Sequence, residues 1–451
     1  MKANTAVFRR FMLRRFEAVQ RANQRFRSRF SNTGFMVLSA LGIAMIIGIN
    51  GRLSLASQIF TLLTVIVVLG LAASVLFRPR LSVVRRLPPF VTAGEEALYT
   101  LLVTNAGDRH QRGLYLQDEL RESFPSYDEF VYCDDPADRY RNAFDRLVGF
   151  PKWSWLAAQK RGAALKLAKL PSIPAHGGVE VSQRFVPLRR GFLHWETCCI
   201  VRPDPFGVVN AVRRITVADS LLVLPKRYPI ASIRLPGNRI YQPGGVVLAA
   251  SSSDAEEFIS LRDYRPGDSL RHIHWKSWAK AAKPIVKEHR PEYFARYALI
   301  LDTFAAANGA AVFEEAVSVA ASLLVSFDLQ ELLIDLIFVG AQPYRFTGGR
   351  GLGGSIQLLK ILACVEATYT QTPGALHDAV LHHAGQFSGC VLVLLDWDDH
   401  RRRLVQNLRA RAIKTLVFVV SEGSIQDVGE RGEEDFIELP IGRIAETLAS
   451  L

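Results

Sequence analysis

Two apolar runs near the N-terminus constrain the fold of this 451-residue chain more than any other feature. Residues 34–49 are almost entirely apolar, and residues 59–77 are apolar apart from three hydroxyl side chains. A helix needs roughly 20 residues to cross the hydrocarbon layer of a bilayer. Arginines flank the pair on both outer sides, and positive charge marks the cytoplasmic side of a span. We therefore predict a transmembrane helical hairpin over residues 34–77, with the N- and C-terminal parts of the chain in the cytoplasm.

A cleaved signal sequence is the competing interpretation of the first apolar run. The basic leader before it is 33 residues long, which exceeds the charged region of a signal peptide, and a second apolar run follows directly. A membrane anchor is therefore favoured. Residues 1–33 interleave aromatic side chains with arginines, which predicts either an amphipathic helix on anionic lipid or a basic tail that sets topology.

The charge of the chain is concentrated at this end. The formal net charge is +12, of which residues 1–33 carry +8 and residues 34–90 carry +5. The rest of the chain therefore has a net charge of −1. Because a nucleic-acid binder is expected to carry its excess charge on a folded face, we predict no nucleic-acid partner.

Residues 81–230 predict an antiparallel β-sandwich. Short stretches of alternating apolar and polar residues, for example 97–103 and 179–186, are bounded by Gly, Pro or Asp. Residues 124–175 fit this pattern poorly. The tryptophans in it and the run from Leu156 to Leu170 predict a helical insertion.

Residues 293–451 alternate between apolar strands and amphipathic helices. This order predicts a parallel sheet covered on both faces by helices, a Rossmann-like α/β domain. The predicted strands include 298–302, 332–339, 390–396 and 414–420.

The linker over residues 231–292 contains the densest mixture of charges and aromatic rings in the chain, which we call the signature segment (254–292). A Pro-Gly turn at residues 266–267 precedes an acid that suits a helix start, so a helix is predicted over 269–282 and a short strand from Ile285 to His289. The candidate site residues are Arg262, Asp263, Tyr264, Gly267, Asp268, Arg271 and Trp275. They form either a charge-paired latch between the sandwich and the α/β domain or a docking surface for a partner, because Arg and Trp are enriched at interaction hot spots.

The spacing of these residues resembles a family signature. The run Leu261-Arg262-x-Tyr264-x-x-Gly267-Asp268-x-x-Arg271-x-Ile273-x-Trp275, followed by Val286-Lys287-Glu288, is similar to bacterial domain-of-unknown-function family fifty-eight. The resemblance implies a membrane-anchored protein of the bacterial inner membrane and a von Willebrand factor A-like C-terminal domain. It also implies a MoxR-type AAA+ ATPase as partner.

Two acids stand at the ends of predicted strands, Asp302 and Asp396. Ligands bind beyond the carboxyl ends of strands in such sheets. In metal-binding von Willebrand domains the first strand ends D-x-S-x-S, but here the two hydroxyl positions are Phe304 and Ala306. Magnesium prefers about six oxygen ligands, so two isolated carboxylates are a weak candidate site. We predict no cofactor, with Mg²⁺ at Asp302 and Asp396 as the alternative.

Catalytic motifs are missing from the sequence. It has no G-x-x-x-x-G-K-[ST] run and no H-E-x-x-H, and its five cysteines show no C-x-x-C spacing. The residues therefore predict a non-enzymatic protein-interaction scaffold or adaptor, and the resemblance implies a chaperone-like role in complex maturation. The alternative is a metal-dependent adhesion module or hydrolase that uses Asp302 and Asp396.

Overall fold

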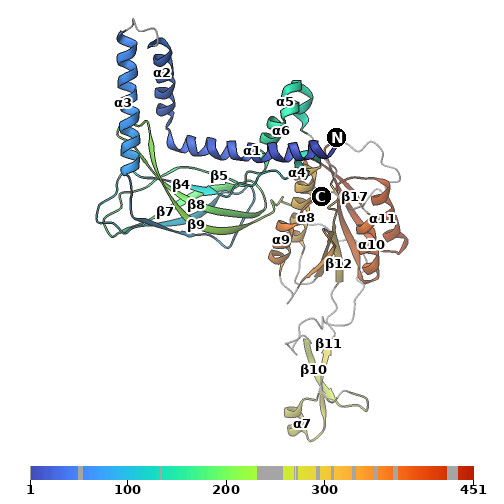
Figure 1. The fold of residues 1–451 in the computed structure, drawn as a ribbon. Helices are drawn as coiled ribbons and strands as arrows, with labels where there is room; N and C mark the ends of the chain where they lie inside the picture. The colour runs from blue at the N-terminus through green and yellow to red at the C-terminus, as the bar shows by residue number, and fades with distance from the viewer. Residues whose placement is uncertain are drawn as a thin grey trace. The chain divides into compact units, whose positions relative to one another are not determined.

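The chain divides into two compact units, which we describe separately. The first comprises Met1–Lys226 with Leu362–Cys364, and the second comprises Arg227–Ile361 with Val365–Leu451. The computed structural model in Figure 1 describes residues 2–48, 54–132, 135–230, 257–268, 270, 273–290, 295–305, 309–327, 332–349, 354–368, 374–423 and 435–450.

Three helices open the first unit: α1 (Lys2–Arg29), α2 (Asn32–Gly48) and α3 (Ser54–Leu76). The basic N-terminal segment is thus a helix over most of its length. Leu55–Leu76 of α3 is long and apolar enough to cross a membrane and is 6% buried, whereas the apolar part of α2 is shorter. The span predicted over residues 59–77 therefore has the required length and composition in the structure, and the other span remains a prediction.

The next elements form two facing sheets. One has the order β1 (Leu81–Arg86), β3 (Ala97–Asn105), β7 (Gly178–Pro187), β5 (Ala163–Leu165), with antiparallel pairs. The other has the order β2 (Phe90–Thr92), β9 (Asn210–Leu224), β8 (Gly191–Pro203), β4 (Tyr115–Leu120), β6 (Ala168–Lys169). Its pairs are antiparallel except β2 with β9. The antiparallel sheets expected from residue alternation are therefore present.

The long strand β8 and the helical insertion complete this unit. Residues 191–195 and 197–201 both belong to the single strand β8, whose register with β9 shifts between Trp195 and Thr197. The insertion contains the expected helices, namely α4 (Tyr127–Tyr132), the 3-10 helix η1 (Pro136–Tyr140), α5 (Ala143–Val148) and α6 (Phe150–Gln159).

The helical prediction for residues 156–170 is wrong after Gln159. The chain leaves the helix at Lys160, and Gly162 then approaches Leu193 so closely that an added Cβ would lie 2.4 Å from Leu193 Cδ2. This close packing directs the chain into β5 and β6 at the sandwich edges, where strand pairing outweighs the helix propensity of an Ala- and Lys-rich run.

A buried ion cluster lies inside the sandwich. The Arg85 guanidinium donates from Nη2 and Nε to both oxygens of Asp118, at 2.6 and 3.0 Å, and from Nη1 to Asp219 at 2.6 Å. The Tyr99 hydroxyl donates to Asp118 at 2.8 Å. Burial and the Asp118 carboxylate raise the pKa of Tyr99. The cluster joins strands of both sheets, and the buried Asp118 carboxylate is paired with Arg85, while Asp219 is 34% exposed.

The second unit is built on a six-stranded sheet. Its order is β14 (Pro343–Gly348), β13 (Leu332–Val339), β12 (Ala295–Leu301), β15 (Gly389–Leu394), β16 (Lys414–Ser421), β17 (Phe436–Pro440). All pairs are parallel except β13 with β14. The edge strands β14 and β17 were not predicted, because they are short and only partly apolar.

Helices cover both faces of this sheet (Figure 1). α10 (Gly374–His383) and α11 (Asp399–Ala410) pack against one face through Leu376, Val380, Leu404 and Leu408. α8 (Ala310–Ser326) and α9 (Ser355–Cys364) lie on the other, and α12 (Ile444–Ala449) follows β17. β12 and β15 are neighbours in the sheet. The chain continues from β12 to β13 on one side of this pair, and from β15 to β16 on the other side. Such a point is where open α/β sheets bind ligands.

The signature segment contains a β-hairpin that was not predicted. β10 (Glu257–Asp263) pairs antiparallel with β11 (Ile285–Arg290), and α7 (Trp275–Ala281) lies between them. The helix expected from residue 269 is shorter, because Ile273 bridges Val286 and His274 N donates to Ile285 O at 2.9 Å. These bonds keep Ile273 and His274 out of the helix. We call Glu257–Arg290 the signature hairpin.

Candidate functional site

One carboxylate organises the tip of the signature hairpin. Asp268 accepts two hydrogen bonds from the guanidinium of Arg262, both at 2.7 Å, and a third from Arg265 N at 2.9 Å. Gly267 has φ +107°, a conformation that suits the turn between these groups. The hydrogen bonds from Arg262 and from the Arg265 backbone lower the pKa of Asp268 to about 2. A bidentate pair of this kind fixes both position and orientation.

A second set of contacts closes the base of the turn. Lys283 donates to Asp263 at 2.7 Å, and Tyr264 N donates to Pro284 O at 3.0 Å. The Arg262–Asp268 and Lys283–Asp263 ion pairs therefore both lie within the signature hairpin. The structure thus brings together Arg262, Asp263, Tyr264, Gly267 and Asp268, whereas Arg271 lies outside the described residues. Whether these residues serve as a latch or a docking surface stays a prediction.

Apolar side chains of the signature hairpin are exposed. Trp275 is 65% exposed and stacks on Trp278 with ring centroids 5.1 Å apart. Leu270 is 68% exposed. Tryptophan exposed to this degree is unusual in a folded element, because its burial is strongly favourable. Trp275 is one of the candidate site residues predicted from the sequence, and the structure leaves it exposed.

Asp302 ends β12 at the carboxyl edge of the sheet, and an arginine neutralises it. Arg401 Nε donates to Asp302 Oδ2 at 2.5 Å, and Leu395 N donates to the same oxygen at 3.2 Å. Phe304 N donates to Oδ1 at 2.9 Å. Burial alone would lower the pKa of Arg401, but the adjacent carboxylates of Asp302 and Asp398 raise it. The Arg401 guanidinium therefore lies next to the Asp302 carboxylate, in the position that a metal ion bound by this carboxylate would take.

Asp396, the other metal candidate, does not share this environment. Its side chain is exposed and accepts a hydrogen bond from Trp397 N at 2.7 Å. Thr303, which follows Asp302 in the chain, donates its hydroxyl to Val339 O. Within the described part of the chain, no three His, Cys, Asp or Glu side chains gather as a metal-ligand group.

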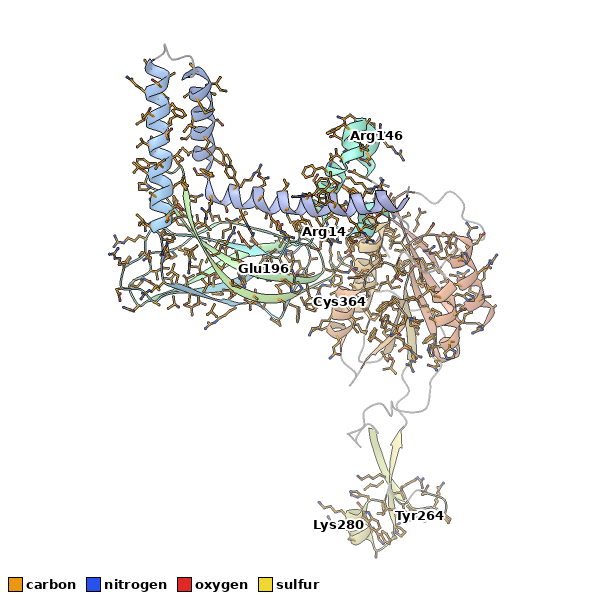
Figure 2. The ribbon with its side chains drawn as sticks, viewed as in Figure 1. Arg14, Arg146, Glu196, Tyr264, Lys280 and Cys364 are labelled. Atoms are coloured by element: carbon orange, nitrogen blue, oxygen red, sulfur yellow. The ribbon has the colours of Figure 1, made fainter. Side chains whose placement is uncertain are left out.

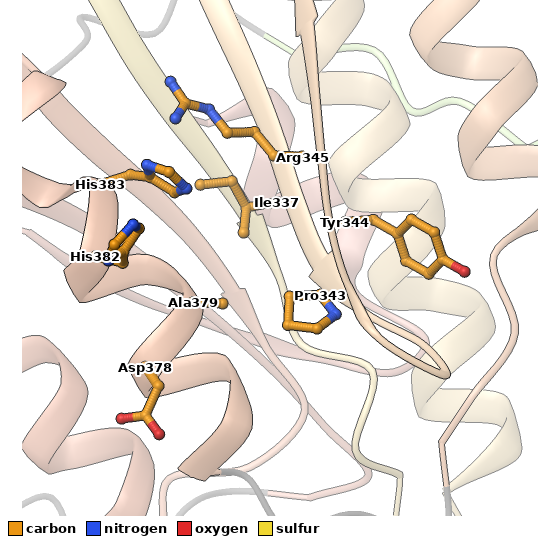
Figure 3. A pocket seen from close by; sticks show the side chains of 8 residues that line it. All are labelled: Ile337, Pro343, Tyr344, Arg345, Asp378, Ala379, His382 and His383. Carbon is orange, nitrogen blue, oxygen red and sulfur yellow. The ribbon is translucent and has the colours of Figure 1, made fainter.

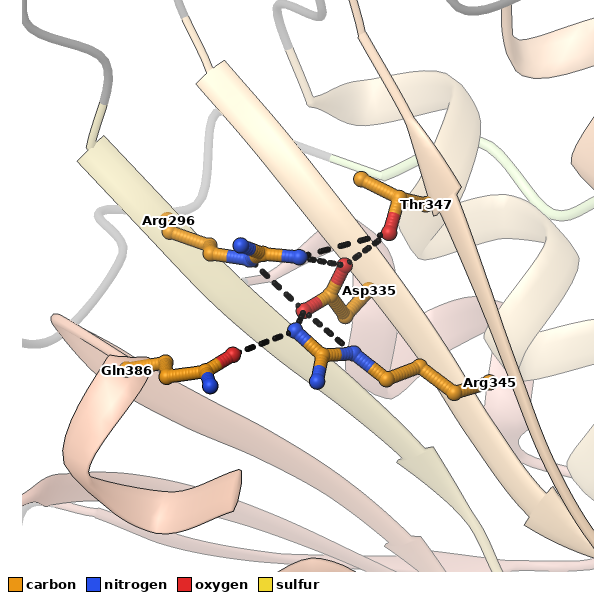
Figure 4. Close-up of polar contacts among 5 residues, drawn as sticks. All are labelled: Arg296, Asp335, Arg345, Thr347 and Gln386. Carbon is orange, nitrogen blue, oxygen red and sulfur yellow. Dashed lines mark hydrogen bonds and ion pairs between the residues drawn. The ribbon is translucent and has the colours of Figure 1, made fainter. Parts of the chain in front are cut away.

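A polar cluster that the sequence analysis missed surrounds Asp335 on β13 (Figure 4). Its carboxylate accepts hydrogen bonds from Arg296 at 2.8 and 3.1 Å, from Arg345 at 2.7 and 3.0 Å, and from the Thr347 hydroxyl at 2.6 Å. Arg345 also donates to Gln386 Oε1 at 2.8 Å. The sequence does contain a signal for this cluster. Asp335 lies within the apolar run LLIDLIFV, and a buried acid in such a run needs a cation from a neighbouring strand.

A pocket of about 360 Å³ opens beside this cluster (Figure 3). Arg345 from β14 and His382 and His383 from α10 line it, together with Tyr344 and Asp378. Burial, Arg345 and His382 lower the pKa of His383. A neutral imidazole beside an arginine suits hydrogen bonding to an anion, but the Arg345 guanidinium is already engaged by Asp335 and Gln386.

Comparison with known proteins supports the family resemblance over part of the chain. Residues 260–430 match the family model described as "Protein of unknown function DUF58". This range contains the signature hairpin from residue 260 and most of the six-stranded sheet. The resemblance stated from the sequence is thus confirmed for these residues. The matched range does not include the β-sandwich.

The chain is also similar to the uncharacterized protein YeaD of Bacillus subtilis (strain 168). The two are 28% identical over 167 residues, which is 37% of this chain and 40% of that protein. Two solved structures overlap parts of the chain at low similarity. A CARDB domain of a Pyrococcus furiosus protein covers 32% of this chain and 94% of its own, with 11% identity and a TM-score of 0.18. A PapD-like domain of human CEP192 covers 31% of this chain and 85% of its own, with 14% identity and a TM-score of 0.16.

Proposed function

We propose that this protein is an adaptor of the bacterial inner membrane, which holds a protein-docking hairpin on the cytoplasmic side. Its partner is a MoxR-type AAA+ ATPase, and its role is chaperone-like complex maturation. The observation that carries the proposal is the 65% exposure of Trp275 on a hairpin whose turn is fixed by the Arg262–Asp268 pair. Because the hairpin already holds the stacked rings of Trp275 and Trp278 in place, it would lose little conformational entropy when a partner binds.

The anchor in this proposal is a two-span hairpin of α2 and α3. Both helices are apolar and carry no Asp, Glu, Lys or Arg within the described residues. Arginines precede α2 and follow α3, which favours a cytoplasmic location for both ends. Cys364 is exposed at the end of α9, so an impermeant thiol reagent should label it in inverted membrane vesicles and not in intact spheroplasts.

The second unit is proposed to be von Willebrand factor A-like. In chain order its strands lie 3-2-1-4-5-6 with the third antiparallel, and Asp302 ends the central strand. The pairing of Asp302 with Arg401 supports a domain that works without a metal ion. This favours the adaptor over the metal-dependent adhesion module or hydrolase.

Co-purification from native membranes tests the docking role. We expect Trp275→Ala and Arg271→Ala to lose the ATPase partner while remaining folded and membrane-bound. Phe192→Ala is the matched control, because Phe192 is 58% exposed on β8, outside the signature hairpin. If the Trp275 and Arg271 variants recover the same partners as the unmodified protein, the docking surface is excluded and the hairpin is a structural latch.

A further inference from the structure

The tip formed by η1 and α5 exposes three large apolar side chains. Tyr140 is 92%, Phe144 70% and Leu147 81% exposed. Their spacing of four and three residues places Phe144 and Leu147 on one face of α5, with Tyr140 one turn before them. Exposed apolar groups of this size, gathered at one place, mark an interaction surface.

This tip is an ordered structure. Asn142 caps α5 by accepting a hydrogen bond from Asp145 N at 2.8 Å, and Gly149 ends the helix with φ +73°. Arg141 bridges Asp135 at 2.6 Å and Asp138 at 2.9 Å, which fixes the preceding turn. The apolar side chains are therefore held outward by a capped and cross-linked loop.

The tip is joined to the basic helix α1 through a small core. Trp153 of α6 is 1% exposed and packs against Phe16 of α1 and Phe124, with ring centroids 5.8 and 5.7 Å apart. Leu13 of α1 belongs to the same cluster. The rigid support of the tip is thus α1 itself.

The other end of α1 is fixed next to the proposed membrane hairpin. Phe30 bridges Val209, and Ser31 N donates to Val208 O at 3.2 Å. Gly34, in the first turn of α2, lies so close to the same strand region that an added Cβ would be 2.2 Å from Val208 O. Within the first unit, α5 and the α2–α3 pair extend to the same side of α1 (Figure 1).

Exposed arginines flank the apolar tip, in which Arg139, Arg141 and Arg146 balance the formal charge of Asp135, Asp138 and Asp145. Arg139 and Arg146 are exposed beside Tyr140 and Leu147, and Arg14 is exposed on α1. Figure 2 shows Arg146 on α5 and Arg14 on α1. Apolar side chains flanked by arginines match the boundary between anionic headgroups and acyl chains, where basic side chains are attracted to the headgroups.

We propose that the η1–α5 tip is a second membrane contact, which inserts Phe144 and Leu147 at the acyl boundary while Arg139 and Arg146 bind anionic phospholipid headgroups. The inference rests on the proposed membrane anchoring by α2 and α3. Together the two contacts hold α1 along the membrane surface, so that the β-sandwich keeps one orientation to the bilayer.

Photocrosslinking of the full chain tests this contact. Three variants carry p-benzoylphenylalanine, at Leu147 in the tip, at Val65 in α3 and at Leu98 in β3. All three positions are at least 47% exposed. β1 follows α3 directly, and the pairing of Arg86 with Thr100 places Leu98 beyond the end of β1 that is remote from α3. Leu98 is therefore the control for an exposed apolar position away from lipid.

The variants are reconstituted in vesicles of phosphatidylcholine and phosphatidylglycerol, irradiated, and analysed for lipid adducts by mass spectrometry. We expect adducts at Leu147 and Val65 in several-fold excess over Leu98. Adducts at Val65 with none above the Leu98 level at Leu147 overturn the second contact and leave the anchor intact. No adducts at Val65 overturn the anchor, and the inference fails with it.

Two further arms separate the lipid from other occupants. In vesicles of phosphatidylcholine alone, the Leu147 yield should fall while the Val65 yield is unchanged, and an unchanged Leu147 yield overturns the anionic-lipid assignment. In native membranes the Leu147 adduct should again be lipid. A protein adduct at Leu147 that replaces the lipid adduct there assigns the tip to a protein partner and overturns the proposal.

Discussion

Arg401 on α11 donates from Nε to Asp302 at the end of β12, across 99 positions of sequence and 2.5 Å of space. The two side chains are 7% and 1% exposed. Arg401 also donates to Phe304 O at 3.0 Å and to Asp398 at 2.6 Å. The guanidinium thus joins the first strand of the sheet to the helix after β15 and compensates a carboxylate that is shielded from water.

Removal of this arginine should destabilise the second unit. In Arg401→Met the Asp302 carboxylate is left buried and unpaired, which costs about 3–5 kcal/mol. Thermal or denaturant unfolding measures the loss. Arg403→Met is the matched control, because Arg403 is exposed on the same helix. Asp302→Asn combined with Arg401→Met should recover part of the loss, since no buried charge remains. An Arg401→Met variant as stable as Arg403→Met would contradict a structural role for the pair.

Divalent cations should not bind at Asp302. One carboxylate oxygen accepts from Arg401 and Leu395 N, and the other accepts from Phe304 N, so few lone pairs remain for a metal ion. Isothermal titration with Mg²⁺ and Mn²⁺ should give no stoichiometric heat. A stoichiometric response that Asp302→Ala abolishes would instead favour the metal-dependent alternative.

The Asp335 cluster should be equally sensitive to loss of its single acid. In Asp335→Asn two guanidinium groups face each other without a carboxylate, and we expect a loss of about 3 kcal/mol. This is the lower end of the range for a broken buried pair, because Arg296 and Arg345 are 20% and 21% exposed and retain some contact with water. Asp378→Asn, with a side chain 86% exposed, should unfold like the unmodified protein.

Asp268 should titrate well below an ordinary aspartate. Its pKa is about 2 in the folded hairpin, against an ordinary value of 3.8. Since the folded value is depressed, the stabilisation from Arg262 is complete above pH 3.8 and is lost as the pH falls through 2. Carboxyl chemical shifts of labelled protein measure the midpoint. Arg262→Gln should move it back toward 3.8, and a midpoint that this substitution leaves unchanged would show that Arg262 is not the cause.

Thiol reactivity should separate Cys364 from the other described cysteines. Cys198, Cys199 and Cys390 are buried, and burial raises the pKa of each thiol, for Cys390 to about 12. Cys364 is exposed. Because the thiolate is the reactive form, a maleimide should modify Cys364 first, as identified by peptide mass spectrometry. Modification of Cys198 or Cys390 in folded Cys364→Ser protein would show that their units open.

Local periodicity predicted much of the fold. The apolar runs at α2 and α3, the alternation in β3 and β7, and the buried strand β13 are all encoded within single stretches of about 10 to 20 residues. Hairpin pairing was harder to predict. β10 and β11 are separated by 21 residues of charged and aromatic sequence, and neither strand has the alternation of a half-buried sheet. The edge strands β14 and β17 were missed because they are short and only partly apolar.

The sequence by itself determined which segments are apolar, where the strongly periodic helices and strands lie, and which residues carry the family signature, because these properties depend on neighbours along the chain. The tertiary structure alone decided that Arg401 neutralises Asp302, that Arg296 and Arg345 meet at Asp335, and that the η1–α5 tip faces the same side as α3. These relationships join residues from different elements. Their formation depends on strand order and helix packing, which set the distances between side chains that are remote in sequence.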